Sequence, residues 1–155
     1  MITKQVLGVN HFALTVPDLE EGLAFFRDQL GFRKKFEVEF DGFRVVMLKA
    51  GKMEMEIWAD SAEFGVHHFG VQVKNIEAVL SHMRETGVEI LTDIYEPTEG
   101  LKEAIVRGPG GVRVQFVEET FIFPTWYYEL KAAHHVSSLP KEMVPHRRCT
   151  KWLNP

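Results

Sequence analysis

The sequence predicts an α+β fold built from two copies of a βαβββ module, and three observations carry this prediction. First, residues 10–20 (NHFALTVPDLE) are matched by residues 67–77 (HHFGVQVKNIE), with His11 and His68 in the same frame. Second, each stretch alternates apolar and polar residues as a strand does, and each runs into a helical pattern. Third, three more strand patterns follow each helix. An all-helical or doubly wound parallel fold would need more helices than this chain offers.

The length of 155 residues suits two small modules that share one core, because modules of under about 80 residues seldom fold alone. We place the first module at residues 1–60 and the second at residues 61–119. Residues 120–155 then form a C-terminal extension rich in aromatic and basic residues. We expect this extension to pack against the protein, over a site or a dimer partner, and both options stay open.

Charge and composition exclude several classes of partner. A net charge of −4 argues against binding to a nucleic-acid backbone. No apolar run approaches the roughly 18 residues of a membrane span, so we expect no membrane partner. The first residues lack the apolar core of a secretion signal. Cys149 is the single cysteine, which precludes an internal disulfide and suits a reducing cytosol, so we expect a cytoplasmic protein.

In the first module, Asp18 and Glu21 form a variant of the capping box that begins a helix after the opening strand. Gly31 ends that helix. Strands are predicted at residues 33–40 and 43–49, around an Asp-Gly hairpin turn, and again at residues 52–58. The helix buries one stripe, which consists of Leu19, Leu23, Phe26 and Leu30.

The second module repeats this order. Its first strand covers residues 66–73, Asn75 caps the following helix and Gly87 ends it. Strands follow at about residues 88–94 and 102–107. A Pro-Gly-Gly turn then leads into the last strand at residues 112–118. The buried stripe of this helix consists of Ile76, Val79, Leu80 and Met83.

The strand faces that carry no core residues hold the candidate metal ligands. Alternation places Phe12, Leu14 and Val16 toward a core and leaves His11 on the opposite face. Equivalent alternation places Phe69, Val71 and Val73 toward a core, as it does Met53, Met55 and Ile57. The opposite faces then present His11, Glu56, His68 and Gln115. If the two sheets curl so that these faces meet, the four side chains form a mixed nitrogen and oxygen shell for a divalent metal.

At this point the chain resembles the vicinal oxygen chelate superfamily, which includes glyoxalase I, methylmalonyl-CoA epimerase, extradiol dioxygenases and the bleomycin resistance proteins. The resemblance covers roughly residues 7–119. It rests on four stretches, NHFALTVPDLE, AFFRDQLGF, GVHHFGVQVKNIEAV and GPGGVRVQFVE. It implies curled βαβββ sheets around a metal-binding cup, with ligands on the first and last strand of each module. Those positions are His11, Glu56, His68 and Gln115, and the pattern looks most like the epimerase branch.

The last ligand position departs from the usual pattern, because it holds Gln115 where the superfamily usually has glutamate. An amide in place of a carboxylate leaves the metal site more positive, which favours a bound enolate, but it removes one candidate base. Glu56 would then have to leave the metal and act as the base. Glu54, on the same face about 7 Å along the strand, is the other candidate.

Other side chains have weaker claims. Arg113 is a candidate for contact with an anionic substrate, although a structural ion pair explains it equally well. Trp58 is a second candidate for substrate contact. We expect His67 to be a hydrogen-bonded or surface residue that points away from the cup. Cys149, His134, His135 and His146 receive no role.

The leading functional hypothesis is an isomerase, epimerase or glyoxalase-like lyase that uses a divalent ion (Zn, Ni, Co, Mn or Fe). The enzyme would remove a proton next to a carbonyl of a small-molecule substrate. One alternative is an Fe(II)-dependent ring-cleaving dioxygenase, because two histidines and a carboxylate also form a facial triad. The other alternative is a metal-free binding or resistance protein. We expect a homodimer, and whether the cup lies within one chain or is shared across the dimer stays open.

Overall fold

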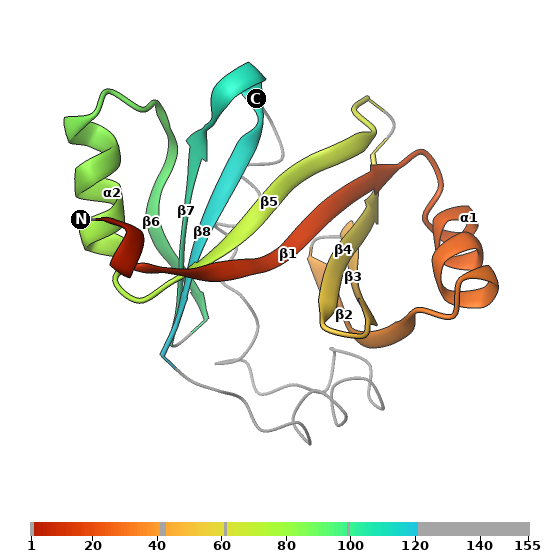
Figure 1. The fold of residues 1–155 in the computed structure, drawn as a ribbon. Coiled ribbons are helices and arrows are strands. Elements are labelled where there is room, and N and C mark those ends of the chain that lie inside the picture. Colours follow the sequence, from red (N-terminus) through yellow and green to blue (C-terminus); the bar gives the residue numbers. More distant parts are fainter. Residues whose placement is uncertain (1, 41–42, 61, 99, 121–155) are drawn as a thin grey trace. The chain divides into compact units, whose positions relative to one another are not determined.

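The structure, a computed structural model, describes residues 2–40, 43–60, 62–98 and 100–120. Two βαβββ modules follow each other along the chain (Figure 1), as the sequence predicts. The first consists of β1 (Val6–Val16), α1 (Leu19–Leu23), β2 (Arg33–Phe40), β3 (Phe43–Ala50) and β4 (Met53–Ala59). The second consists of β5 (Gly65–Val73), α2 (Ile76–Glu85), β6 (Ile90–Thr98), β7 (Leu101–Arg107) and β8 (Arg113–Glu119).

The two modules share one strand topology, which is the structural mark of the duplication. The strand order is β2-β3-β4-β1 in the first module and β5-β8-β7-β6 in the second. In each, the first strand pairs in parallel with the last, and the other pairs are antiparallel. The mixed α+β class is therefore confirmed.

The chain forms two compact units whose boundary falls within β1. One unit contains His11–His67, and the other contains residues 2–10 together with residues 68–120. In the second of these units, the short helical turn η1 (Ile2–Lys4) precedes β1, and Ile2 packs against the core beside α2. The Lys74 amide donates to the Gln5 carbonyl at 2.9 Å, which ties the start of the chain to the end of β5.

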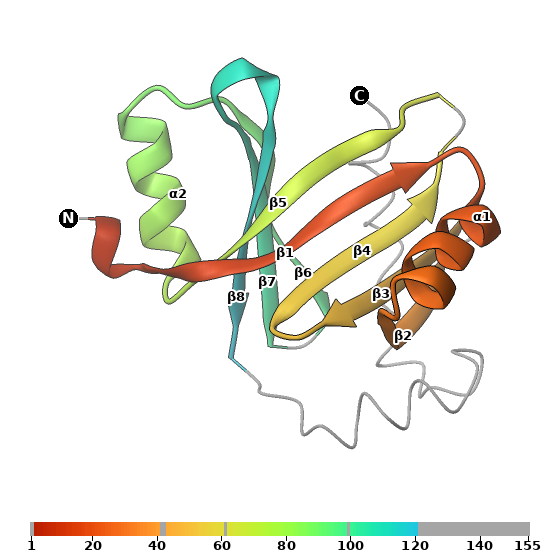
Figure 2. The same cartoon turned by 45° about the vertical axis from the view of Figure 1, so that its right-hand side comes forward.

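The first helix begins and ends where the sequence predicts, with Gly31 in the left-handed conformation (φ 73°) directly after Leu30, but the turns of its second half are wider. The Asp18 carboxylate accepts a hydrogen bond from the Glu21 amide at 2.9 Å, which satisfies one of the free amides at the helix start. After α1 the chain continues as the π-helical segment η2 (Ala24–Gln29), beside the sheet in Figure 2. The wider turn shifts the phase of the buried stripe, so Leu30 is 53% exposed instead of buried.

The antiparallel strands of the first module depart from simple alternation at two places. β2 and β3 pair as far as Phe40 and Phe43, as a two-residue hairpin requires. The predicted turn residues, 41–42, lie outside the described residues. A bulge at Lys35 interrupts the register between β2 and β3. Met53, predicted for the core, is 38% exposed at the start of β4.

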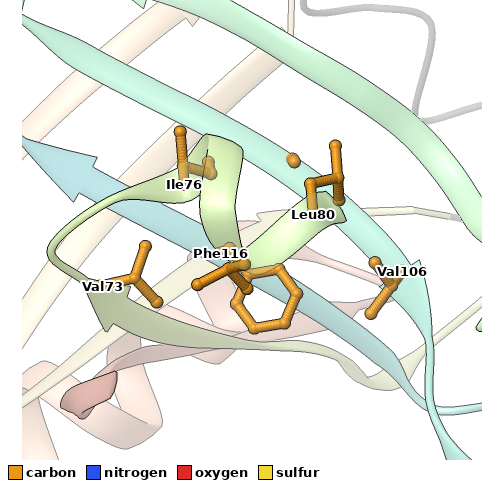
Figure 3. Packing of buried hydrophobic residues seen from close by; sticks show 7 residues of the cluster. Val73, Ile76, Leu80, Val106 and Phe116 are labelled. Carbon is orange, nitrogen blue, oxygen red and sulfur yellow. The ribbon is translucent and has the colours of Figure 1, made fainter. Parts of the chain in front are cut away.

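The core of the second module lies between α2 and its sheet (Figure 3). The Asn75 side chain accepts from the Ala78 amide at 2.7 Å and caps α2, as predicted. Phe69 departs from the predicted pattern, because it is 42% exposed and contributes nothing to this core. The buried cluster consists of Val73, Ile76, Val79, Leu80, Ala104, Val106 and Phe116.

The predicted extension at residues 120–155 falls, apart from Thr120, outside the described residues. Within the described part of the chain, every helix is too short or too polar to cross a membrane.

Candidate metal centre

The first module places His11 and Glu56 side by side on the sheet face opposite α1. β1 and β4 run parallel, with Ala13 directly opposite Glu56. His11 is two residues before Ala13, so it points to the same face and lies diagonally across from Glu56. His11 is 4% exposed and Ala13 is completely buried. The parallel register thus brings His11 and Glu56 together beside the small Ala13 side chain.

His11 and Glu56 are spaced so that one cation can contact both. The distance from His11 Nε2 to Glu56 Oε2 is 3.8 Å, which is longer than a hydrogen bond. A divalent transition metal forms bonds of about 2.1 Å to imidazole nitrogen and to carboxylate oxygen. The observed separation is smaller than two such bonds laid end to end. The pair therefore fits as two ligands of one ion.

Burial raises the pKa of Glu56 to about 7, from the ordinary glutamate value of 4.5. The cause is loss of hydration, which disfavours the charged carboxylate. A carboxyl group with a pKa near neutral both accepts and releases a proton readily at physiological pH. A bound cation would hold the same group in its charged form.

The second module repeats this arrangement with a histidine and an amide. β5 and β8 run parallel, with Gly70 directly opposite Gln115. His68 is two residues before Gly70, so it takes the place in this module that His11 takes in the first. Gly70 likewise corresponds to Ala13. His68 is completely buried and Gln115 is 3% exposed.

The Gln115 side chain carries a buried oxygen that fits a ligand role. Gln115 Oε1 is shielded from solvent and accepts no hydrogen bond from the described residues. An unsatisfied buried polar atom costs about 1–3 kcal/mol, so it calls for an explanation. Amide oxygen binds divalent cations, and a cation at this oxygen would remove the cost. This observation is independent of any resemblance to other proteins.

Glu54 lies on the same face of β4 as Glu56, but lysine side chains surround it. Lys35 Nζ donates to both Glu54 carboxylate oxygens, at 2.7 and 2.8 Å. Lys49 Nζ lies 3.6 Å from Glu54 Oε1. Two ammonium groups therefore hold the Glu54 carboxylate in ion pairs at this place on the strand. The bulge at Lys35 directs this lysine toward Glu54, and sequence alternation alone did not reveal that contact.

The two residues predicted to contact substrate differ in exposure. Arg113 is partly buried on β8, directly opposite His68 on β5. Trp58 is completely buried on β4, opposite Thr15 on β1. Of the two options expected for His67, a hydrogen-bonded or a surface residue, its burial excludes the surface one. It is 6% exposed, and its ring packs edge-on against Trp58 with centroids 4.9 Å apart.

Sequence reasoning missed a polar pair in the second module. The Tyr95 hydroxyl donates a hydrogen bond to Glu103 Oε2, and the two residues are cross-strand partners of β6 and β7. Glu103 alternates with the buried Ala104, and this alternation indicates that the Glu103 side chain points away from the core. The partner was hidden, because β6 contains several register shifts. Four residues that received no role from the sequence lie outside the described residues, namely Cys149, His134, His135 and His146.

The chain has two βαβββ modules, and each has metal-ligand residue types on its first and last strands. These two features define its class of protein. The sequence profile of the Glyoxalase/Bleomycin resistance protein/Dioxygenase superfamily matches residues 8–116. The chain belongs to this superfamily, which confirms the expected resemblance.

Several relatives and solved structures are named as epimerases. Mitochondrial methylmalonyl-CoA epimerase of Mus musculus is 31% identical over 125 residues, which cover 69% of this chain and 70% of that protein. The 2-epi-5-epi-valiolone epimerase of an Actinomyces species is 25% identical and covers 61% of this chain and 67% of that protein. The structure of methylmalonyl-CoA epimerase from Mycobacterium tuberculosis superposes with a TM-score of 0.65 at 20% identity, covering 82% of this chain and 95% of that one. The predicted enzyme class, isomerase or epimerase, is confirmed at this level.

Proposed function

We propose that this protein is a divalent-metal-dependent epimerase that inverts a carbon atom next to a carbonyl group. The observation that carries the proposal is the diagonal pair of a histidine and an oxygen donor, repeated on the same strands of both modules. We infer that His11 and Glu56 of one unit and His68 of the other are ligands of the same ion, since their residue types suit a metal. The unsatisfied Gln115 oxygen supplies a fourth donor.

The four residues together would hold a borderline transition ion. Two neutral imidazoles, one carboxylate and one amide are a donor set for Zn, Ni, Co, Mn or Fe. When bound, such an ion polarises a carbonyl oxygen and lowers the energy of the enolate formed by loss of the neighbouring proton. Because Gln115 is neutral, this chain supplies only one negative ligand. The site therefore favours an anionic reaction intermediate more than a site with two carboxylates would.

We assign proton abstraction to Glu56. Its carboxylate takes the proton from the carbon next to the carbonyl, and the electron pair of that C–H bond moves into the enolate. As a ligand, Glu56 would have to be released from the cation before its carboxylate could accept the proton. Glu54 is the weaker candidate, since its carboxylate is already engaged by Lys35 and Lys49.

We propose methylmalonyl-CoA, or a related 2-carboxyacyl thioester, as the substrate. This follows the names of the relatives, and it also suits the site chemically. Such a compound has an acidic C–H bond between two carbonyl-type groups, whose oxygens can bind one cation together. Arg113 would contact an anionic group of the substrate, and Trp58 would shape the apolar side of the pocket.

The test combines metal analysis with an epimerase assay. Purified protein, stripped with chelator and reloaded with Co²⁺, Mn²⁺, Ni²⁺ or Zn²⁺, is expected to epimerise methylmalonyl-CoA only when metal is present. His11→Ala and Glu56→Gln are expected to lower the rate at least 100-fold. Full activity after chelation would contradict the proposal. Uptake of oxygen with a catechol and Fe²⁺, in place of epimerase activity, would favour the dioxygenase alternative.

We also propose a homodimer in the cytoplasm. The unit that contains residues 2–10 and 68–120 exposes Leu7, Val9 and Phe69, and exposed apolar side chains of this size often contact a partner. Sedimentation velocity would show a monomer if this proposal is wrong. The mammalian relatives are named as mitochondrial, so fractionation of the source cells is the test of the compartment.

A further inference from the structure

The first module carries a cluster of two lysines and one glutamate, and its lysines have no part in the proposed metal site. Lys35 Nζ donates to both carboxylate oxygens of Glu54, at 2.7 and 2.8 Å, and Lys49 Nζ lies 3.6 Å from one of them. All three residues belong to the unit that contains His11–His67. Two ammonium groups therefore share one carboxylate, and the three side chains together carry a net positive charge.

The cluster lies on the face of the sheet that also presents Glu56. Glu54 comes two residues before Glu56 on β4, so the two side chains point to the same face, about 7 Å apart along the strand. Lys49 on β3 is directly opposite Glu54, and directly opposite residues of an antiparallel pair share a face. The ammonium groups therefore stand beside the carboxylate to which we assign proton abstraction.

Glu54 does not provide Lys49 with a hydrogen bond. The separation of 3.6 Å between Lys49 Nζ and Glu54 Oε1 is longer than a hydrogen bond, and Lys35 already donates to both oxygens. An ammonium group has three N–H donors. The Lys49 side chain is 38% exposed, so a molecule from solvent can reach it, while Lys35 and Glu54 are each only 20% exposed. Charges that are partly buried are screened less by salt, so an added anion gains more here than on an open surface.

We propose that Lys49 and Lys35 form a binding subsite for an oxyanion of the substrate, which is a carboxylate or a phosphate. The assignment to the substrate rests on the proposed function, whereas binding of a free anion at these lysines does not. Glu54 is the internal competitor of the anion, because its carboxylate occupies the same ammonium groups when no substrate is bound. The charge-assisted hydrogen bonds of the lysines favour a thioester with an anionic group over a neutral one.

Binding of small anions to the chelator-treated full chain tests the subsite without catalysis. Malonate and inorganic phosphate are titrated at low salt and followed by calorimetry. Lys49→Gln is expected to weaken anion binding about tenfold, because it removes a charged hydrogen-bond donor. Glu54→Gln is expected to strengthen anion binding about threefold or more, since the competing carboxylate is gone. Damage to the fold would lower the affinity in both variants, so the opposite signs separate binding from stability.

Lys34→Gln is the matched control, because it removes the same charge from the residue next to Lys35. Lys34 is 36% exposed, close to the exposure of Lys49, and forms its ion pair with Glu37. This variant should bind both anions like the wild-type protein. Equal losses in Lys34→Gln and Lys49→Gln would reveal a general effect of net charge and overturn the inference. Unchanged or weaker binding by Glu54→Gln overturns it too, as does a wild-type protein that binds neither anion.

Two substrates then identify the oxyanion. Methylmalonyl-CoA carries a carboxylate and phosphates, whereas methylmalonyl-pantetheine keeps the carboxylate and lacks the phosphates. If the subsite takes the carboxylate, Lys49→Gln raises KM about tenfold for both thioesters with little change in kcat. A rise for methylmalonyl-CoA alone identifies a phosphate, and an unchanged KM for both overturns the assignment to the substrate. A wild-type protein that epimerises neither thioester contradicts the proposed function, while the anion titration still decides whether the subsite exists.

Discussion

Glu56 and Gln115 occupy corresponding positions on the last strands of the two modules, yet their chemistry differs. Each is directly opposite a small residue, Ala13 or Gly70, and each is diagonal to a histidine. Only Glu56 can carry a proton. The duplication therefore preserved the geometry of the pair, while the side chains at the oxygen-donor position differ in whether they can carry a proton.

The raised pKa of Glu56 predicts how the stability of the metal-free protein depends on pH. Because the folded pKa, about 7, lies above the ordinary 4.5, the folded state binds this proton more tightly than the unfolded state does. The contribution is fully present below pH 4.5 and is lost as the pH rises toward 7. At about 1.4 kcal/mol per pH unit, the loss is at most about 3.5 kcal/mol, and the 20% exposure of the side chain reduces it.

Urea unfolding of chelator-treated protein between pH 5 and pH 8 measures this loss. Glu56→Gln is the control, because it keeps the shape of the side chain and cannot ionise. The wild-type protein should lose stability relative to this variant as the pH rises. Parallel pH profiles for the two proteins would show that the Glu56 carboxyl group is ionised without cost in the fold.

At the scale of the element, the parallel pairing of first and last strands brings each histidine beside its oxygen donor. Ala13 shows how tightly the first pair is packed, since it is completely buried between His11 and Thr15 on β1. Ala13→Leu is expected to cost about 1–3 kcal/mol of stability by overpacking, and to weaken metal binding at least tenfold by displacing Glu56. Chemical denaturation and a metal titration measure the two effects.

The control for Ala13→Leu is Leu14→Met, the next position on the same strand. Leu14 packs against the core on the opposite face, and a volume-conserving change there usually costs under about 1.5 kcal/mol. This variant should bind metal like the wild-type protein. Equal effects of the two changes on metal affinity would show that β1 acts through overall stability and not through the ligand face.

How much of this could be predicted from the sequence depends on how regular each strand is. Alternation has a fixed period of two, so it identified the faces of β1, β4, β5 and β8 and the four ligand candidates. It could not place Lys35, because a bulge adds a residue and changes which face follows. The register shifts of β6 hid the Tyr95–Glu103 pair in the same way. Leu30 left the core because a π-helical turn changed the helical phase.

At the scale of the whole molecule, the proposed cation would link two half-sites that come from different parts of the chain. A ligand that binds only the folded state stabilises it by an amount set by its concentration and its affinity. With free metal at 100 times its Kd, the free energy of unfolding should rise by about 2.7 kcal/mol. Thermal or urea unfolding with and without metal measures this rise.

Stoichiometry then decides whether the half-sites share one ion. If they do, the protein binds one equivalent of metal per chain, and His11→Ala and His68→Ala each abolish both the binding and the stabilisation. Two independent half-sites would instead give two equivalents, and each variant would retain one of them. A shared ion inside a chain and one shared across a dimer both give one equivalent per chain. Mixing His11→Ala with His68→Ala protein separates these two cases, because only sites built across the dimer regain a complete set of ligands in the mixed dimer.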